Sequence, residues 1–194
     1  MPGRILIIQG HPDPRTIHFG HVLADAYGKA AKEAGHEVRC IRVADLDFPV
    51  LRTKEDWEDG EPVPAIRASQ DLINWAEHLV IFYPLWHGDM PALFKAFVEQ
   101  VFRPGFAVNI REPGKLWEKL LKHKSARIVI TMGMPAFIYH WYFREHSLKS
   151  LKRNILAFSG IGPIHASLIG MVDDNPRARQ RWIAKMTALG QKGE

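Results

Sequence analysis

The sequence predicts an α/β protein whose parallel sheet is covered by helices on both faces. Short apolar runs such as Leu79–Tyr83 fit strands that are buried on both sides, and segments with helical spacing of apolar residues lie between them. The two kinds of segment alternate along the chain without an internal repeat or an interdomain linker. We therefore expect one domain over residues 1–194, with right-handed crossovers between the strands.

The first part of the chain contains two predicted strands and two predicted helices. Arg4–Gln9 is an apolar run, and a loop with two prolines leads from it to Thr16, which can cap the next helix. That helix reaches about Ala34, and Gly35 suits its C-terminal cap. A strand, a polar irregular segment and a second helix follow, at Glu37–Val43, Leu46–Val63 and Ala65–Ala76.

The middle of the chain has the clearest strand, loop and helix. Leu79–Tyr83 is wholly apolar, and Pro84 cannot donate a backbone hydrogen bond to a sheet. An aromatic loop then precedes the helix Pro91–Phe102, whose proline suits a first turn. The remaining expected segments begin with a loop at Arg103–Gly114, a short helix at Lys115–Lys122 and a strand at Ala126–Met132. They end with a helix at Trp141–Phe158, a strand at Ile164–Met171 and a last helix at Asn175–Leu189. In the last helix Asn175 is the expected cap and Pro176 the first helical residue.

Five predicted strands of this kind can be arranged in more than one order. No GxGxxG follows the first strand and the chain has no GxxxxGK[ST], so we expect neither a dinucleotide fingerprint nor a P-loop. We therefore predict a flavodoxin-like α/β fold with a five-stranded parallel sheet of order 2-1-3-4-5 and helices on both faces. In this order the loops after strands one, three and four meet at one edge, where open α/β sheets bind ligands.

Composition restricts the classes of partner and compartment. The net charge of +5 could attract a phosphorylated cofactor or an anionic membrane, but no nucleic-acid motif accompanies it. The single cysteine, Cys40, excludes an intramolecular disulfide and fits a reducing compartment, and we expect its side chain to be buried in a strand. No apolar run reaches the roughly 18 residues of a membrane span. A cytoplasmic protein is expected.

Two of the three convergent loops suit a flat, phosphorylated ligand. Loop one, HPDPRT at 11–16, offers His11, Arg15 and Thr16 beside a helix N-terminus, which is an anion-binding arrangement. Loop three, Tyr83–Met90, offers aromatic faces and backbone amides. The plainer alternatives are an ordinary capped helix start for loop one and core filling by Trp86 for loop three.

Loop four, TMGMPAFIYH at 131–140, adds polar rings to the same edge. Gly133 permits a close approach of the backbone, and Tyr139 and His140 could donate a hydrogen bond to a carbonyl oxygen that gains charge. Tyr139 could equally be a packing residue. The chain has 10 histidines, but although His18 and His21 could share a helix face, nothing completes a zinc pattern. With one cysteine and no GxSxG, hydrolase chemistry is not indicated.

Three segments together resemble a known family. They are ILIIQGHPDPRT at 5–16, VIFYPLWHGDMPALFKAFVEQVFRPGFA at 80–107 and VITMGMPAFIYHWYF at 129–143. The chain resembles the flavodoxin-like NAD(P)H:quinone oxidoreductases, which include mammalian quinone reductase, bacterial modulators of drug activity and the ancillary subunits of potassium-efflux systems. The resemblance implies an FAD or FMN flavoprotein, with NAD(P)H as electron donor and a quinone-like acceptor reduced by two-electron, ping-pong transfer. It also implies a homodimer.

The resemblance also implies roles for individual residues. His11, Thr16, His18 and Phe19 would lie at the phosphate or ribityl end of the flavin, although many relatives have asparagine where this chain has Phe19. The isoalloxazine ring would lie along Pro84, Leu85, Trp86 and His87. The polar edge of the ring would meet Thr131, Met132 and Gly133. Tyr139 matches the family's active-site tyrosine. His146, one position from the ungapped alignment, and His140 are both candidates for the active-site histidine.

Two other functions remain open at this stage. Some members of the family are regulatory subunits of membrane transporters, so a potassium-efflux or other transport system is a possible partner, with or without catalysis. A one-electron flavodoxin carrier is disfavoured, because such carriers are typically acidic and this chain is basic. The sequence does not choose between FAD and FMN, or between NADH and NADPH.

Overall fold

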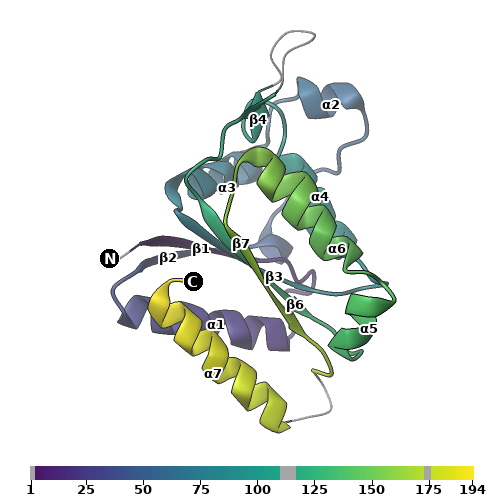
Figure 1. Cartoon of the computed structure of the whole chain (residues 1–194). Helices are drawn as coiled ribbons and strands as arrows, with labels where there is room; N and C mark the ends of the chain where they lie inside the picture. The colour runs from purple at the N-terminus through teal and green to yellow at the C-terminus, as the bar shows by residue number, and fades with distance from the viewer. Residues whose placement is uncertain (1–2, 110–116, 173–175) are drawn as a thin grey trace.

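The computed structural model describes residues 3–109, 117–172 and 176–194. Its centre is a five-stranded sheet of order β2-β1-β3-β6-β7 in which every neighbouring pair is parallel (Figure 1). The strands are β1 (Arg4–Gln9), β2 (Glu37–Arg42), β3 (His78–Pro84), β6 (Ser125–Thr131) and β7 (Ile164–Ile169). Counted in chain order these are strands 2-1-3-4-5, so the predicted fold class and strand order are confirmed.

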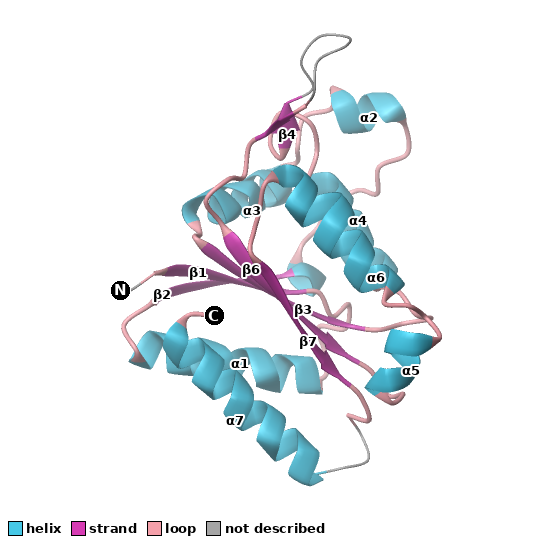
Figure 2. Cartoon of the chain, in the orientation of Figure 1, coloured by secondary structure: helices cyan, strands magenta, loops and turns pink. Residues whose placement is uncertain are grey.

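Helices cover both faces of the sheet (Figure 2). On one face lie α1 (Phe19–Glu33) and α7 (Pro176–Lys192); on the other lie α3 (Pro64–Trp75), α4 (Ala92–Val101), α6 (His146–Lys149) and the π-helix η2 (Ser150–Ala157). Strand side chains alternate between two hydrophobic clusters: Leu6 and Ile8 pack on the α4 side, whereas Ile5 and Ile7 pack on the α1 side. This double burial explains why the strands are continuous apolar runs in the sequence.

The segment Leu46–Val63 is less irregular than expected. A 3-10 turn, η1 (Val43–Asp45), precedes it, and it contains the short helix α2 (Lys54–Glu58). The Thr53 hydroxyl accepts a hydrogen bond from the Asp56 N–H at 3.0 Å, and the Asp56 carboxylate accepts one from the Thr53 N–H at 3.2 Å. This reciprocal pair is a capping box, and the spacing of Thr53 and Asp56 was the local signal for it.

The expected helix Lys115–Lys122 was wrong for its described part. Glu118–Lys119 is instead strand β5, which pairs antiparallel with β4 (Val108–Asn109) inside the expected loop Arg103–Gly114. Residues 110–116 lie outside the described part of the chain. Two-residue strands have no periodicity of their own, so only the pairing across the loop defines them.

The expected helix Trp141–Phe158 is confirmed from His146 onward but is interrupted before it. A helix, α5, begins earlier and covers Ala136–Trp141, and α6 starts only at His146. Arg144 and Glu145 have φ of 49° and 56°, in the left-handed region, so the helical path is interrupted between α5 and α6 although the apolar pattern continues. The interruption turns Phe143 onto loop three, as described below.

Several smaller expectations differ from the structure. Thr16 is not the cap of α1, because the helix begins at Phe19 with His18 at the capping position. Cys40 is exposed on the edge strand β2 rather than buried. Pro176 is the first residue of α7 as predicted, whereas Asn175 lies outside the described residues. In the described part of the chain, no helix is both long and apolar enough to cross a membrane.

Candidate functional site

The three loops predicted to converge lie next to one another at the carboxyl edge of the sheet. The Gly10 N–H donates to the Phe82 carbonyl at 2.7 Å, which joins loop one to the end of β3. The Leu85 N–H donates to the Thr131 carbonyl at 2.8 Å, which joins loop three to the end of β6. A Cβ placed on Gly20 would lie 4.0 Å from Thr131 Oγ1, so the start of α1 approaches loop four as well.

Loop one is organised around a cluster of imidazole rings. The His11 ring is nearly buried and stacks on the His18 ring with 3.7 Å between centroids. His11 Nδ1 accepts a hydrogen bond from the Asp13 N–H at 3.1 Å, while the Asp13 carboxylate lies 3.1 Å from His18 Nε2. His11 therefore carries its proton on Nε2 when it is neutral, which makes this nitrogen a hydrogen-bond donor.

Burial decides the charge of this cluster. Desolvation, followed by repulsion from His18 and His21, lowers the pKa of His11 from 6.5 to about 4. Hydrogen bonds from the Arg15 N–H and from His18 hold the pKa of Asp13 well below its usual range. At neutral pH loop one thus presents a neutral imidazole and a firmly ionised carboxylate, and the exposed side chain of Arg15 lies 3.6 Å from Asp13.

Thr16 of loop one and Phe19 at the start of α1 differ in their surroundings. Thr16 is exposed, and its side chain helps to lower the pKa of the Asp13 carboxyl. Phe19 is buried in the cluster between α1 and the sheet, and the Arg179 guanidinium lies 4.4 Å from its ring centroid. Thr16 is accessible to a ligand at the edge of the sheet. The Phe19 ring is instead packed in the core and lies under the Arg179 guanidinium.

Loop three ends in a tight turn that presents an aromatic ring. Trp86 and Asp89 exchange two backbone hydrogen bonds, at 2.8 and 2.9 Å, and the central residues His87 and Gly88 have φ of 49° and 80°. Trp86 remains 48% exposed, and its ring meets the His11 ring edge-on at 6.0 Å. The alternative in which Trp86 fills the core does not hold. Pro84 and Leu85, immediately before the turn, are partly buried, and His87 is exposed.

Loop four offers a backbone that a flat ligand can approach. Thr131 and Met132 are buried, and the Met132 N–H donates to the Ile169 carbonyl at 2.9 Å. A Cβ built on Gly133 would meet no atom within 4 Å, so open space borders this backbone. The half-exposed Trp86, the His11 donor and the open Gly133 backbone fit a planar cofactor with hydrogen-bonding edges, such as a flavin.

Tyr139 lies in the core, away from solvent. It is fully buried; its hydroxyl accepts from the Leu148 N–H at 3.0 Å and lies 2.8 Å from Ser147 Oγ. The Tyr83 hydroxyl lies 3.2 Å from the same serine oxygen. Burial raises the pKa of Tyr139, so the phenol stays protonated. This position corresponds to the packing alternative, and a catalytic role for Tyr139 stays a prediction.

The two candidate histidines lie on the surface around the interruption between α5 and α6. His140 Nδ1 pairs with Glu145 at 2.7 Å, and its side chain is 70% exposed. His146 is exposed at the start of α6. Neither is buried among the three loops, so the structure does not choose a proton donor. Over residues 3–109, 117–172 and 176–194, no group of three or more His, Cys, Asp or Glu side chains is arranged to hold a metal ion.

Sequence reasoning missed two residues that shape this region. Ser147 joins the hydroxyls of Tyr83 and Tyr139, which come from β3 and α5. Asp13 orders loop one through its contacts with Arg15 and His18. The spacing of Asp13 and Arg15 was a local signal, because aspartate commonly accepts a hydrogen bond from the backbone two residues on. Ser147 had no such signal, since its partners are distant in sequence.

Comparison with known proteins agrees with this geometry. A family model described as flavodoxin-like fold matches residues 3–189, so the chain belongs to the family of that fold. An uncharacterized NAD(P)H oxidoreductase of Haemophilus influenzae is 27% identical, over 97% of this chain and 98% of that one. FMN-dependent NADH:quinone oxidoreductase 2 of Listeria monocytogenes is 24% identical over 97% of each chain.

A solved structure extends the likeness of fold to the whole chain. The NAD(P)H:quinone oxidoreductase from Methanothermobacter marburgensis superposes with a TM-score of 0.81, covering 100% of both chains at 19% identity. At this level of identity the superposition concerns the fold.

Proposed function

We propose that this protein is a flavin-dependent NAD(P)H oxidoreductase that reduces quinones or similar flat acceptors. The observation that carries the proposal is the edge where loops one, three and four are fastened together, with half-exposed Trp86 and open backbone at Gly133. Relatives named as NAD(P)H and NADH:quinone oxidoreductases match nearly the full length of the chain and support the same reaction class.

The chain's own residues would bind and orient the cofactor. A bound flavin supplies two-electron transfer between NAD(P)H and the acceptor. His11, Thr16 and His18 would hold its phosphate end, with Phe19 behind them. The ring would lie along residues 84–87, and Thr131, Met132 and Gly133 would meet its polar edge. The FMN dependence named for the Listeria relative supports FMN, while FAD remains the alternative.

The proton donor belongs to the same proposal. Tyr139, His146 and His140 remain the candidates. The two histidines are exposed and could exchange protons with solvent, whereas the Tyr139 hydroxyl is engaged by Ser147 and Leu148. A catalytic Tyr139 would therefore require loop four to move when the acceptor binds.

A homodimer in the cytoplasm completes the proposal. Three large aromatic side chains of the α5 region are strongly exposed, which supports a surface that a second copy covers: Phe137, Trp141 and Tyr142. Light scattering at micromolar concentration should give twice the chain mass of 22.1 kDa. None of the relatives named above is a transporter subunit, so the regulatory alternative gains no support from them.

Steady-state kinetics test the proposed reaction. If donor and acceptor occupy the same stacked place in turn, initial rates with varied NAD(P)H at several quinone concentrations give parallel double-reciprocal lines. Intersecting lines would mean that both substrates are bound together, which this single-site arrangement does not allow. Release of the flavin by heat and separation by chromatography identifies FMN or FAD in the same preparation.

A further inference from the structure

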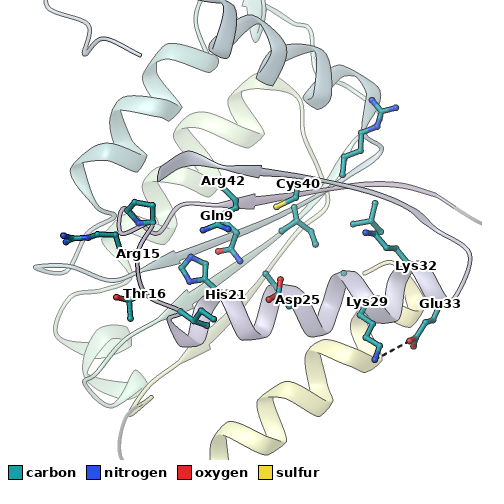
Figure 3. Close-up of a pocket in the computed structure, with 17 residues that line it drawn as sticks. Gln9, Arg15, Thr16, His21, Asp25, Lys29, Lys32, Glu33, Cys40 and Arg42 are labelled. Atoms are coloured by element: carbon teal, nitrogen blue, oxygen red, sulfur yellow. Dashed lines mark ion pairs between the residues drawn. The ribbon is translucent and has the colours of Figure 1, made fainter. Parts of the chain in front are cut away.

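A groove beside the flavin edge has no role in the reaction described so far. It lies between α1 and the edge strand β2, has a volume of about 750 Å³, and is lined by residues of β1, loop one, α1 and β2 (Figure 3). Ile7, Ala24, Gly28 and Val38 supply apolar or small lining residues. Gly28 lets α1 pack closely on the sheet, because a Cβ there would lie 3.0 Å from Ile7 Cδ1.

Gln9 places an unpaired acceptor in this groove. The residue is only 5% exposed, and its Nε2 donates to the Gly20 carbonyl at 3.3 Å. Its Oε1 is buried, and no donor within the described part of the chain reaches it. Because a buried acceptor without a partner is costly, a turn of the Gln9 side chain that brings Oε1 to a ligand N–H in the groove would be favoured.

His21 adds a donor to the lining. Its Nδ1 accepts a hydrogen bond from the His18 N–H at 3.0 Å, so the neutral ring carries its proton on Nε2. Burial and the nearby Arg42 lower the pKa of His21, which keeps the ring neutral near pH 7. Gln9 and His21 thus provide an acceptor and a donor in one groove, which complements the amino group and ring nitrogen of an adenine edge.

The polar residues of α1 continue this pattern along the groove. His21, Asp25 and Lys32 follow at spacings of four and seven and point toward β2, whereas Lys29 points away from the strand toward Glu33 (Figure 3). From His21 to Lys32 the helix rises roughly 16 Å at about 1.5 Å per residue. The order along this face is a donor, a carboxylate that can accept from sugar hydroxyls, and a cation.

The far end of the groove carries Lys32. The arginines of the lining are engaged elsewhere: Arg15 lies 3.6 Å from Asp13, Arg39 lies over the Trp75 ring, and Arg42 lies 3.2 Å from Asp45. Lys29 lies 3.9 Å from Glu33, whereas Lys32 has no carboxylate partner among the described residues. Lys32 is therefore available for an anion.

We propose that this groove binds a nucleotide whose base carries an exocyclic amino group, with AMP as the simplest case. The base lies against Gln9 and His21, the ribose beside Asp25, and the phosphate at Lys32. The site adjoins the proposed phosphate end of the flavin, because Arg15 and Thr16 of loop one also line the groove. The proposal goes beyond the oxidoreductase activity and does not depend on it.

Titration calorimetry with the purified, flavin-loaded protein tests the site. AMP should bind in a saturable way, and IMP should bind at least about tenfold more weakly, because its carbonyl oxygen would face the Gln9 acceptor instead of an amino donor. Ribose 5-phosphate, which lacks the base, should also bind more weakly than AMP.

Three variants locate the binding. Lys32→Gln should weaken AMP about tenfold, since one charge-assisted contact is lost, while the matched surface change Lys152→Gln should have no effect. Cys40→Trp should block the groove from the exposed wall of β2. Gln9→Leu should remove the preference for AMP over IMP; if it does not fold, Lys32→Gln and Cys40→Trp still decide.

Several results would overturn the proposal. They are no saturable AMP binding at millimolar concentration, equal affinity for AMP and IMP, binding that Lys32→Gln and Cys40→Trp leave unchanged, and release of flavin by AMP, which would place AMP in the flavin's phosphate site. The assay needs no turnover. A protein that binds AMP but reduces no quinone would refute the oxidoreductase proposal alone.

Discussion

His11 shows at the scale of one residue how the fold sets chemistry. Its ring is covered by His18, meets the edge of Trp86, and accepts a hydrogen bond from the Asp13 N–H. These contacts keep the imidazole neutral and orient its remaining N–H. A neutral donor can hydrogen bond to a phosphate at neutral pH without depending on protonation, whereas an exposed histidine would titrate near pH 6.5.

The neutral His11 makes stability depend on pH. Its folded pKa of about 4 lies below the reference value of 6.5, so the unfolded chain binds the proton more strongly and stability falls as pH drops through this interval. At pH 5 this loss is on the order of 1 kcal/mol relative to pH 7, because water screens part of the effect. Urea unfolding of His11→Gln should show a correspondingly smaller loss. His165→Gln, on the exposed part of β7, is the control and should retain the wild-type dependence.

Tyr139 allows packing and catalysis to be separated. Tyr139→Phe should lower the unfolding free energy by about 1–2 kcal/mol, because the Leu148 N–H and Ser147 hydroxyl lose a buried partner. Ser147→Ala disturbs the same network and leaves the phenol in place. Turnover that falls equally in both flavin-loaded variants would assign the loss to the network. A fall confined to Tyr139→Phe would support its catalytic role.

At the scale of elements, loop three depends on the interruption between α5 and α6. That interruption carries Phe143 over Gly88, and a Cβ at Gly88 would lie 2.5 Å from the Phe143 ring. Neither the interruption nor the contact of Phe143 with Gly88 could be predicted from sequence, because the apolar pattern of 141–158 continues through the break. The strands were predictable because burial on both faces produces continuous apolar runs, and the long helices because their apolar residues recur at helical spacing.

Gly88→Ala should therefore destabilise the protein more than backbone strain alone. Gly105 has a similar φ of 83° but open space around it, against 80° and Phe143 at Gly88, so Gly105→Ala is the matched control. We expect about 1–2 kcal/mol for the control and at least about 1 kcal/mol more for Gly88→Ala, measured by chemical unfolding. Equal losses would mean that Phe143 moves aside freely.

Loop four gives the complementary prediction. Because nothing lies within 4 Å of a Cβ at Gly133, Gly133→Val should leave the thermal unfolding midpoint of the flavin-free protein nearly unchanged. Flavin affinity should fall sharply, as the new side chain occupies the space beside the backbone. Full retention of flavin, measured by equilibrium dialysis, would show that the cofactor does not approach this glycine.

The sequence predicted the meeting of loops one, three and four because strand order follows from alternation and from the missing phosphate motifs. It did not predict which side chains turn inward. Tyr139 is covered by Ser147 and Leu148, and Gln9 is buried with a free acceptor, through contacts between distant segments. The architecture of the site was thus readable from local pattern, whereas the orientation of its polar groups depended on tertiary packing.

At the scale of the whole molecule, two helical layers fix a sheet whose carboxyl edge carries the proposed site. The layer of α1 and α7 positions loop one, and the opposite layer positions loops three and four (Figure 1). Packing on both faces holds the strand ends in register, and backbone hydrogen bonds from Gly10 to Phe82 and from Leu85 to Thr131 join the loops. The edge is therefore ready to accept a rigid, flat cofactor at small cost in ordering.

An anaerobic visible titration of the purified protein tests the central claim most directly. The account predicts flavin absorption bands that bleach on addition of NADPH or NADH and return in full when a quinone is added. Bound flavin that neither nucleotide bleaches would contradict the reductase function. A colourless protein that cannot be reconstituted with FMN or FAD would contradict the flavin site itself.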